Sequence, residues 1–272
     1  MSAEKITFIG AGNMASSLVR GLLASGVGAA QLCASDPAAA QLAELKGTGI
    51  ATTDSNDTAV AGADVVVIAV KPQVLGAVLR DLSTLQPGQL LLSIAAGVPL
   101  ASLAAWTCAT QPIIRCMPNT PALVGAGMTA LYANAAVTGA QRDLAEKIMA
   151  AAGKTLWVAD EGALDAVTAI SGSGPAYYFY LMEAMVEAGI ELGLDRESAT
   201  TLTLETAYGA ALMARGSATA PAQLRENVTS PGGTTAAALS VFDAADTRQI
   251  IKNALHGAAD RSRELAKEFG TP

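Results

Sequence analysis

The sequence predicts an α/β domain over residues 1–161, followed by an all-α domain over residues 162–272. Three observations support this prediction. The chain opens with a strand–turn–helix unit that contains a glycine pattern, apolar strands then alternate with helices to about residue 160, and strand patterns cease after residue 162. Alternating strands and helices are typical of a mostly parallel sheet that helices cover on both faces.

The first element is a short strand that ends in Gly-Ala-Gly-Asn-Met-Ala, residues 10–15. Gly10 permits a tight turn, Gly12 lets the backbone approach a pyrophosphate, and Ala15 allows the helix to pack closely on the strand. The helix stops near Gly26, and its apolar stripe consists of Met14, Leu18, Leu22 and Leu23. Its free N-terminal N–H groups favour phosphate. The pattern therefore predicts a Rossmann-type dinucleotide-binding domain; the alternative is a glycine-rich turn without a ligand.

The other elements follow in order along the chain. Strands are predicted over residues 5–9, 31–35, 64–70, 89–94, 112–117, 128–133 and 155–158. The run 65–70 is apolar on both faces, as in strands buried within a parallel sheet. Helical patterns lie between most of the strands, including 73–83 and 139–152. In the second domain, helices are predicted over residues 174–193, 196–215, 234–243 and 246–268.

The composition predicts a cytoplasmic protein that binds neither nucleic acid nor membrane. A net charge of −7 disfavours both partners. No apolar run reaches about 20 residues, and the N-terminus enters a strand directly, so neither a membrane span nor a signal peptide is expected.

The three cysteines, Cys33, Cys108 and Cys116, are odd in number and lack metal spacing, which predicts reduced core thiols. With His256 the only histidine, we expect no metal site.

The low content of charged residues also indicates that part of the apolar surface is buried against another subunit. Only 15% of the residues are charged, whereas 51% are apolar. Residues 178–186 form a helix that is apolar around most of its circumference, and such a helix is buried on several sides. We expect a homodimer that buries this helix; the alternative is an internal helix of a larger bundle.

Small and polar residues follow several strand ends, where parallel sheets bind ligands. Asp36 stands where an acidic residue meets the adenosine ribose of NAD, and a helix N-cap explains it equally well. Lys71 is expected to reach a cofactor phosphate or ribose, with a solvated loop lysine as the alternative. The segment Ala-Ala-Gly at 95–97 would let a flat ring lie close, although packing alone also explains it.

Three further segments suit the binding of a small substrate. Residues 115–121 form a rigid polar loop at a strand end. Residues 170–177 and 227–235 are helix openings rich in glycine, serine and threonine, whose N–H and hydroxyl groups could cradle a carboxylate. Ordinary helix capping is the alternative for each opening.

Together these segments resemble the pyrroline-5-carboxylate reductase family. The matching residues are 8–15, 69–72, 95–97, 115–121, 165–177 and 228–235, in the family's order. The first motif is shared by many dehydrogenases, whereas the last two are far more specific. The resemblance implies a Rossmann-type domain and a helical dimerisation domain that interlocks with its twofold mate. It also implies an active site between one subunit's cofactor cleft and the partner's helices, and assembly of dimers into higher oligomers such as a decamer.

The resemblance further implies reduction of 1-pyrroline-5-carboxylate to L-proline by NADPH or NADH. The residues that it places around the dinucleotide are Gly10, Ala11, Gly12, Asn13, Met14, Asp36, Asn56, Ala69, Val70, Lys71, Pro72, Ala96 and Asn227. Those that it places at the substrate are Glu161, Ser230, Gly232, Gly233, Thr234 and Thr235. Thr235 is the expected catalytic residue, which hydrogen-bonds the ring nitrogen and assists its protonation. A protonated imine is already electrophilic, so positioning is the main task of the protein.

One departure from the family concerns the coenzyme. Asp36 stands where some members have a neutral serine, and residues 33–41 contain no arginine or lysine. A 2′-phosphate would meet no positive charge from this loop, so NADH is expected to serve at least as well as NADPH.

The nearest alternative function is that of a β-hydroxyacid dehydrogenase, which shares this domain layout. Such an enzyme needs a general base, usually a lysine of the helical domain. Lys252 and Lys267 are the only lysines there, and neither lies in a glycine- and serine-rich opening. A dinucleotide sensor without turnover is a second alternative, which the polar segments of the helical half disfavour.

Overall fold

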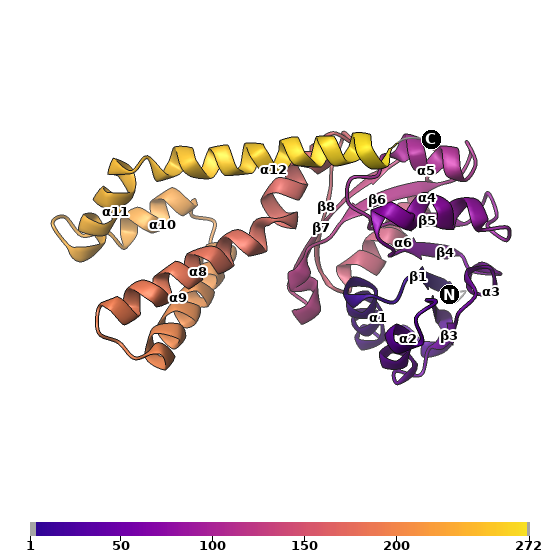
Figure 1. The fold of residues 1–272 in the computed structure, drawn as a ribbon, viewed down its shortest axis with the longest axis horizontal. Helices are drawn as coiled ribbons and strands as arrows, with labels where there is room; N and C mark the ends of the chain where they lie inside the picture. The colour runs from indigo at the N-terminus through magenta and orange to yellow at the C-terminus, as the bar shows by residue number, and fades with distance from the viewer. Residues whose placement is uncertain (1–3, 271–272) are drawn as a thin grey trace. The chain divides into compact units, whose positions relative to one another are not determined.

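The computed structural model describes residues 4–270, which belong to two compact units (Figure 1). The first unit runs up to Ser173 and also includes the chain from Gly257 onward, and the second comprises Gly174–His256. The units therefore divide at a different place from the predicted domains 1–161 and 162–272. The reason is packing: the Ser262 hydroxyl donates a hydrogen bond to Asp165 Oδ1 over 2.6 Å, which ties the end of the last helix to the first unit.

An eight-stranded sheet forms the centre of the first unit, in the order β3-β2-β1-β4-β5-β6-β7-β8. The strands are β1 (Ile6–Ile9), β2 (Leu32–Ser35), β3 (Ala51–Thr53), β4 (Val65–Ile68), β5 (Leu90–Ser93), β6 (Ile113–Met117), β7 (Gly127–Ala133) and β8 (Gly153–Trp157). The first six strands are parallel and follow the doubly wound order of dinucleotide-binding domains. The predicted α/β fold of Rossmann type is confirmed.

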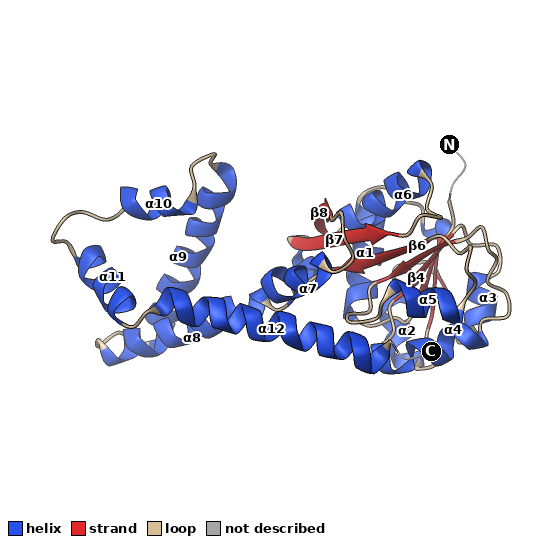
Figure 2. Cartoon of the chain, turned by 90° about the horizontal axis from the view of Figure 1, so that it is seen from above, coloured by secondary structure: helices blue, strands red, loops and turns tan. Residues whose placement is uncertain are grey.

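Helices cover both faces of this sheet (Figure 2). They are α1 (Asn13–Ala24), α2 (Ala39–Lys46), α3 (Asn56–Val60), α4 (Pro72–Asp81), α5 (Leu100–Trp106), α6 (Gly139–Ala150) and α7 (Ala163–Val167), with short turns η1 (Ala29–Gln31), η2 (Thr120–Val124) and η3 (Thr168–Gly172). Successive strand residues point to opposite faces, so each strand serves two cores. Val67 of β4 packs in the core beneath α1, α2 and α6, whereas its neighbours Val66 and Ile68 pack beneath α4 and α5. This two-sided burial explains why the strands are continuous apolar runs.

Two features of the sheet differ from the sequence-based expectation. Strand β3 was not predicted, because Ala51–Thr53 is three residues long, lies at an edge, and carries no apolar run. Strand β7 runs antiparallel to β6, although the patterns suggested parallel strands. The link between β6 and β7 is shorter than the dozen or more residues that a parallel crossover needs.

The cysteines are unpaired, as predicted, but only Cys116 is buried, while Cys33 and Cys108 are half-buried. Burial raises the pKa of the Cys116 thiol far above its usual range, so this thiol stays protonated.

The second unit is entirely helical, as expected. Its helices are α8 (Gly174–Glu191), α9 (Arg196–Gly216), α10 (Pro221–Asn227), α11 (Thr234–Ala244) and the part of α12 (Thr247–Phe269) up to His256. The carboxylate of Asp195 caps α9 by accepting a hydrogen bond from Ser198 N. The apolar face of α8 is open in the single chain, with Phe179 63% and Tyr180 75% exposed. None of the helices in residues 4–270 combines the length and apolar character needed to cross a bilayer.

Candidate active site

The turn after β1 has the geometry that the glycine pattern predicts. Gly10 adopts φ +97°, and a Cβ there would lie 2.7 Å from the carbonyl oxygen of Ala69. A Cβ on Gly12 would meet no protein atom within 4 Å. Gly12 caps α1 from an extended conformation, so open space lies in front of the helix N-terminus. Ala15 is buried where α1 meets the sheet. These features fit a bound pyrophosphate.

Two polar side chains surround this turn. The Asp36 carboxylate accepts hydrogen bonds from Ala11 N through Oδ2 (3.0 Å) and from Ala38 N through Oδ1 (2.8 Å). Ala38, not Asp36, is the N-cap of α2, so the helix-cap alternative for Asp36 is wrong. Asn56 begins α3 and accepts a hydrogen bond from the Ser35 hydroxyl over 2.7 Å. Both side chains therefore lie at the carboxyl end of β2.

The segments after β4 and β5 reach the same edge of the sheet. Ala69 N donates to Ile9 O over 2.8 Å, which places residues 69–72 beside the turn after β1. Lys71 is the exposed N-cap of α4, and Pro72 is its first residue. Ala96 is half-buried in the loop after β5. Except for Asn227, the predicted cofactor residues thus come together at the carboxyl ends of the parallel strands in the first unit.

Glu161 lies in the first unit, in a network of partly buried polar groups. Its Oε1 accepts from Arg115 Nη1 over 2.6 Å and from Leu100 N over 2.7 Å. Arg115 lies on β6, and Leu100 begins α5. The sequence predicts a polar substrate loop over residues 115–121 but no separate role for Arg115. The available signal was a charged residue in the middle of an otherwise apolar strand.

The remaining predicted residues lie in the second unit, between α10 and α11. Asn227 ends α10, and its Oδ1 accepts from Gln223 Nε2 over 3.1 Å. Gly233 N donates to Ser230 O over 3.0 Å, which closes a turn before α11. Gly232 has φ +71° within this turn, a conformation that suits glycine.

Thr234 and Thr235 are the first two residues of α11, whose N-cap is Gly233. Thr235 is therefore not the cap, and its hydroxyl makes no hydrogen bond to any described residue. The capping alternative for Thr235 is wrong. The first N–H groups of α11 have no partner within the helix, so this terminus suits a carboxylate.

The other predicted helix opening, residues 170–177, is built differently. The backbone is already helical from Ala163 and passes through the π-turn η3 before α8 begins. Asn119 Nδ2 donates to Ser171 O over 3.0 Å, so this segment is braced against the loop after β6. The expected helix opening was wrong for residues 170–172, which belong to η3, whereas α8 does begin at Gly174 as predicted. Ser173 N already donates to Thr168 O over 2.8 Å.

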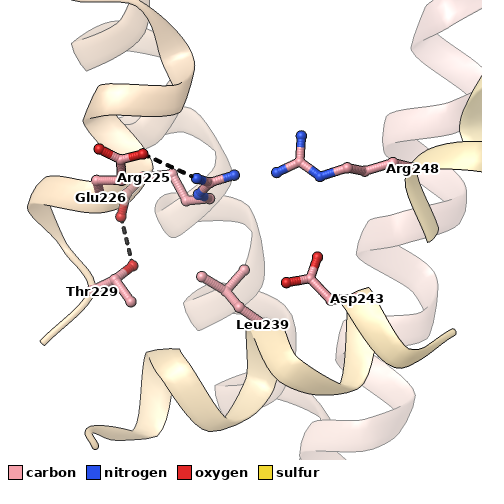
Figure 3. A pocket seen from close by; sticks show the side chains of 6 residues that line it. All are labelled: Arg225, Glu226, Thr229, Leu239, Asp243 and Arg248. Atoms are coloured by element: carbon pink, nitrogen blue, oxygen red, sulfur yellow. Dashed lines mark hydrogen bonds and ion pairs between the residues drawn. The ribbon is translucent and has the colours of Figure 1, made fainter. Parts of the chain in front are cut away.

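A pocket of about 290 Å³ opens in the second unit between α10, α11 and the start of α12 (Figure 3). Its lining residues are Arg225, Glu226, Thr229, Leu239, Asp243 and Arg248. The Thr229 hydroxyl donates to Arg225 O over 2.6 Å and fixes the start of the 230–235 segment. None of the predicted substrate residues lines this pocket. Separately, residues 4–270 contain no cluster of three histidine, cysteine, aspartate or glutamate residues that could hold a metal ion.

Comparison with known proteins covers both units. A family model described as pyrroline-5-carboxylate reductase dimerisation matches residues 161–265, and one described as NADP oxidoreductase, coenzyme F420-dependent, matches residues 5–97. A pyrroline-5-carboxylate reductase of Pseudomonas aeruginosa is 54% identical over 99% of this chain and all of the relative.

Two solved structures similar to this chain are also pyrroline carboxylate reductases. A pyrroline-5-carboxylate reductase of Coxiella burnetii has a TM-score of 0.91 and 41% identity, covering 97% of this chain and 99% of that one. The pyrroline carboxylate reductase of Plasmodium falciparum, solved with NADP bound, has a TM-score of 0.87 and 31% identity, covering 98% and 99%. The chain belongs to the pyrroline-5-carboxylate reductase family.

Proposed function

We infer that this chain catalyses the reduction of 1-pyrroline-5-carboxylate to L-proline with NADPH or NADH. The observation that carries this inference is similarity to pyrroline-5-carboxylate reductases along the whole chain, through the dinucleotide-binding unit and the helical unit alike. The protein is therefore an oxidoreductase that acts on a carbon–nitrogen double bond.

The first unit supplies the coenzyme site. The turn at residues 10–14 and the N-terminus of α1 hold the pyrophosphate, and Asp36 and Asn56 lie where the adenosine ribose binds. Residues 69–72 and Ala96 line the same edge further along the sheet, and Asn227 contributes from the helical unit. When bound, the reduced nicotinamide supplies the hydride.

The substrate groups come from Glu161 and from the segment before α11. Ser230, Gly232, Gly233 and Thr234 form the carboxylate site at the N-terminus of α11, because a helix N-terminus favours an anion. The bond from Gly233 N to Ser230 O shapes this turn, and the first N–H groups of α11 beyond it hold the carboxylate. The Thr235 hydroxyl, which has no partner among the described residues, bonds the ring nitrogen and assists its protonation. A cationic imine accepts a hydride readily, so these residues act by orientation.

The rival β-hydroxyacid dehydrogenase reaction needs a general base that this arrangement does not supply. Lys252 and Lys267 both lie on α12, outside the 230–235 segment.

The active form is a cytoplasmic homodimer, assembled further into oligomers such as a decamer. The exposed aromatic face of α8 supports the dimer, because a large apolar patch of this kind marks an interface. The match to a dimerisation family model over residues 161–265 supports it as well.

The direct test is coenzyme oxidation by the purified protein with 1-pyrroline-5-carboxylate, using NADH and NADPH in parallel. Consumption of either coenzyme with formation of proline is the expected result. β-Hydroxyacids with NAD⁺ or NADP⁺ serve as the comparison. Turnover of a hydroxyacid without turnover of the imine would overturn the proposal.

A further inference from the structure

The ion pair between Arg115 and Glu161 differs from the others in residues 4–270. Its side chains are 13% and 31% exposed, whereas Arg20 and Glu44, a second Arg–Glu pair, are 55% and 59% exposed. Exposed pairs contribute little, because water and salt screen them. A partly buried pair with a short charge-assisted hydrogen bond orients its members more strongly.

The pair also joins three separate parts of the first unit. Arg115 belongs to β6, and Glu161 stands just before α7. The same carboxylate oxygen that bonds Arg115 Nη1 also accepts from Leu100 N, the first residue of α5. Leu100 follows the loop after β5, which contains Ala96. One oxygen atom, Oε1, therefore connects the candidate substrate residue to β6 and to this loop.

The other carboxylate oxygen remains available. Glu161 Oε2 makes no hydrogen bond to any described residue. Arg115 Nη1 and Leu100 N both donate to Oε1, so the direction of Oε2 is also fixed. A carboxylate oxygen held in this way suits the N–H of a cationic imine or of the ammonium product.

We propose that Arg115 is a positioning residue for the reduction, which acts on the substrate through Glu161. This inference rests on the proposed function, and it gives Arg115 a role that differs from coenzyme binding. The turn at residues 10–14 and Asp36, which serve the coenzyme, have no hydrogen bond to Arg115.

Arg115→Met keeps much of the aliphatic stem and removes the charge. We expect kcat/KM for 1-pyrroline-5-carboxylate to fall about 10- to 100-fold, mainly through a higher KM for the imine. The Kd for the coenzyme should change less than about threefold, because its binding groups are intact. Arg115→Lys restores a cation and should recover activity to within about fivefold of wild type.

Arg20→Met is the matched control, since it removes an exposed Arg–Glu pair from the same unit and should leave kcat/KM unchanged. A double-mutant cycle with Glu161→Gln tests whether Arg115 acts through Glu161. The double variant should then lie within about threefold of Glu161→Gln alone, whereas independent effects would multiply.

Each outcome of these measurements supports or overturns the positioning role of Arg115. If wild type reduces the imine but Arg115→Met behaves like Arg20→Met, or only lowers Tm with kcat/KM intact, the inference is overturned while the proposed function stands. Multiplicative losses in the cycle would overturn it too. Should Arg115→Met not fold, Arg115→Lys takes its place in the cycle. The double variant Arg115→Lys with Glu161→Gln should then match Glu161→Gln alone, and a loss that multiplies with that of Glu161→Gln would overturn the inference. If wild type does not reduce the imine, the proposed function itself fails.

Discussion

The carboxylate of Asp36 accepts a hydrogen bond from the backbone N–H of Ala11, with 3.0 Å between Oδ2 and N. This bond joins the end of β2 to the turn after β1. It places a negative charge beside the dinucleotide turn, with no arginine or lysine in residues 33–41. The relationship bears directly on coenzyme choice.

NADH should support kcat/KM at least as high as that of NADPH, because Asp36 repels a 2′-phosphate and accepts hydrogen bonds from an unmodified ribose. Asp36→Ser should shift the ratio of the two kcat/KM values toward NADPH by about tenfold, or about 1.4 kcal/mol. Asp36→Asn is the control, since it retains an acceptor for Ala11 N but loses the charge. A strong NADPH preference that neither substitution alters would contradict this role.

Gly10 and Gly12 should respond differently to the same substitution. Gly10→Ala places a methyl group against Ala69 O at φ +97°, which should cost about 2 kcal/mol or more of folding free energy. Gly12→Ala meets no protein atom and should cost at most about 1 kcal/mol, yet weaken coenzyme binding at least about tenfold by blocking the phosphates. Thermal melts and coenzyme titrations measure both effects. Unchanged coenzyme affinity in Gly12→Ala would argue that the turn is merely structural.

Thr235→Val should lower kcat/KM for the imine roughly 10- to 150-fold, because a hydrogen bond to a charged group contributes about 1.5–3 kcal/mol. Coenzyme affinity and Tm should hardly change, since the hydroxyl has no partner in the described chain. Ser240→Ala, which removes an exposed hydroxyl from the same helix, is the control. Steady-state kinetics beside a melting curve decides the matter: lost stability with normal turnover would refute the catalytic role.

Phe179→Glu should dissociate the dimer and abolish imine reduction, because a charge on the exposed apolar face of α8 opposes its burial. Analytical ultracentrifugation measures the assembly, and coenzyme titration checks that the first unit still binds its ligand. Lys46→Glu, a charge change on exposed α2, should leave both the mass and the activity unaffected. A fully active Phe179→Glu protein of unchanged mass would show that this face is not the interface.

Local sequence patterns predicted the turns and helices that depend on a few adjacent residues. The spacing of Gly10, Gly12 and Ala15 predicts the turn, and apolar periodicity that continues over many turns predicts the long helices. The close approach of Gly10 to Ala69 O is the physical reason that the turn needs glycine. Strand β3 was missed because an edge strand of three small or polar residues has no apolar signature. The helix opening expected at residues 170–177 was wrong for residues 170–172 because glycine and serine also occur in a π-turn within a helical run.

The sequence by itself determined the α/β fold followed by helices, the dinucleotide turn and the family, since these depend on residue spacing along the chain. Only the tertiary structure decided the direction of β7, the return of the last helix to the first unit, and the pairing of Glu161 with Arg115 across 46 positions of the sequence. These features depend on contacts between residues far apart in the chain, and no local pattern records which partners folding brings together.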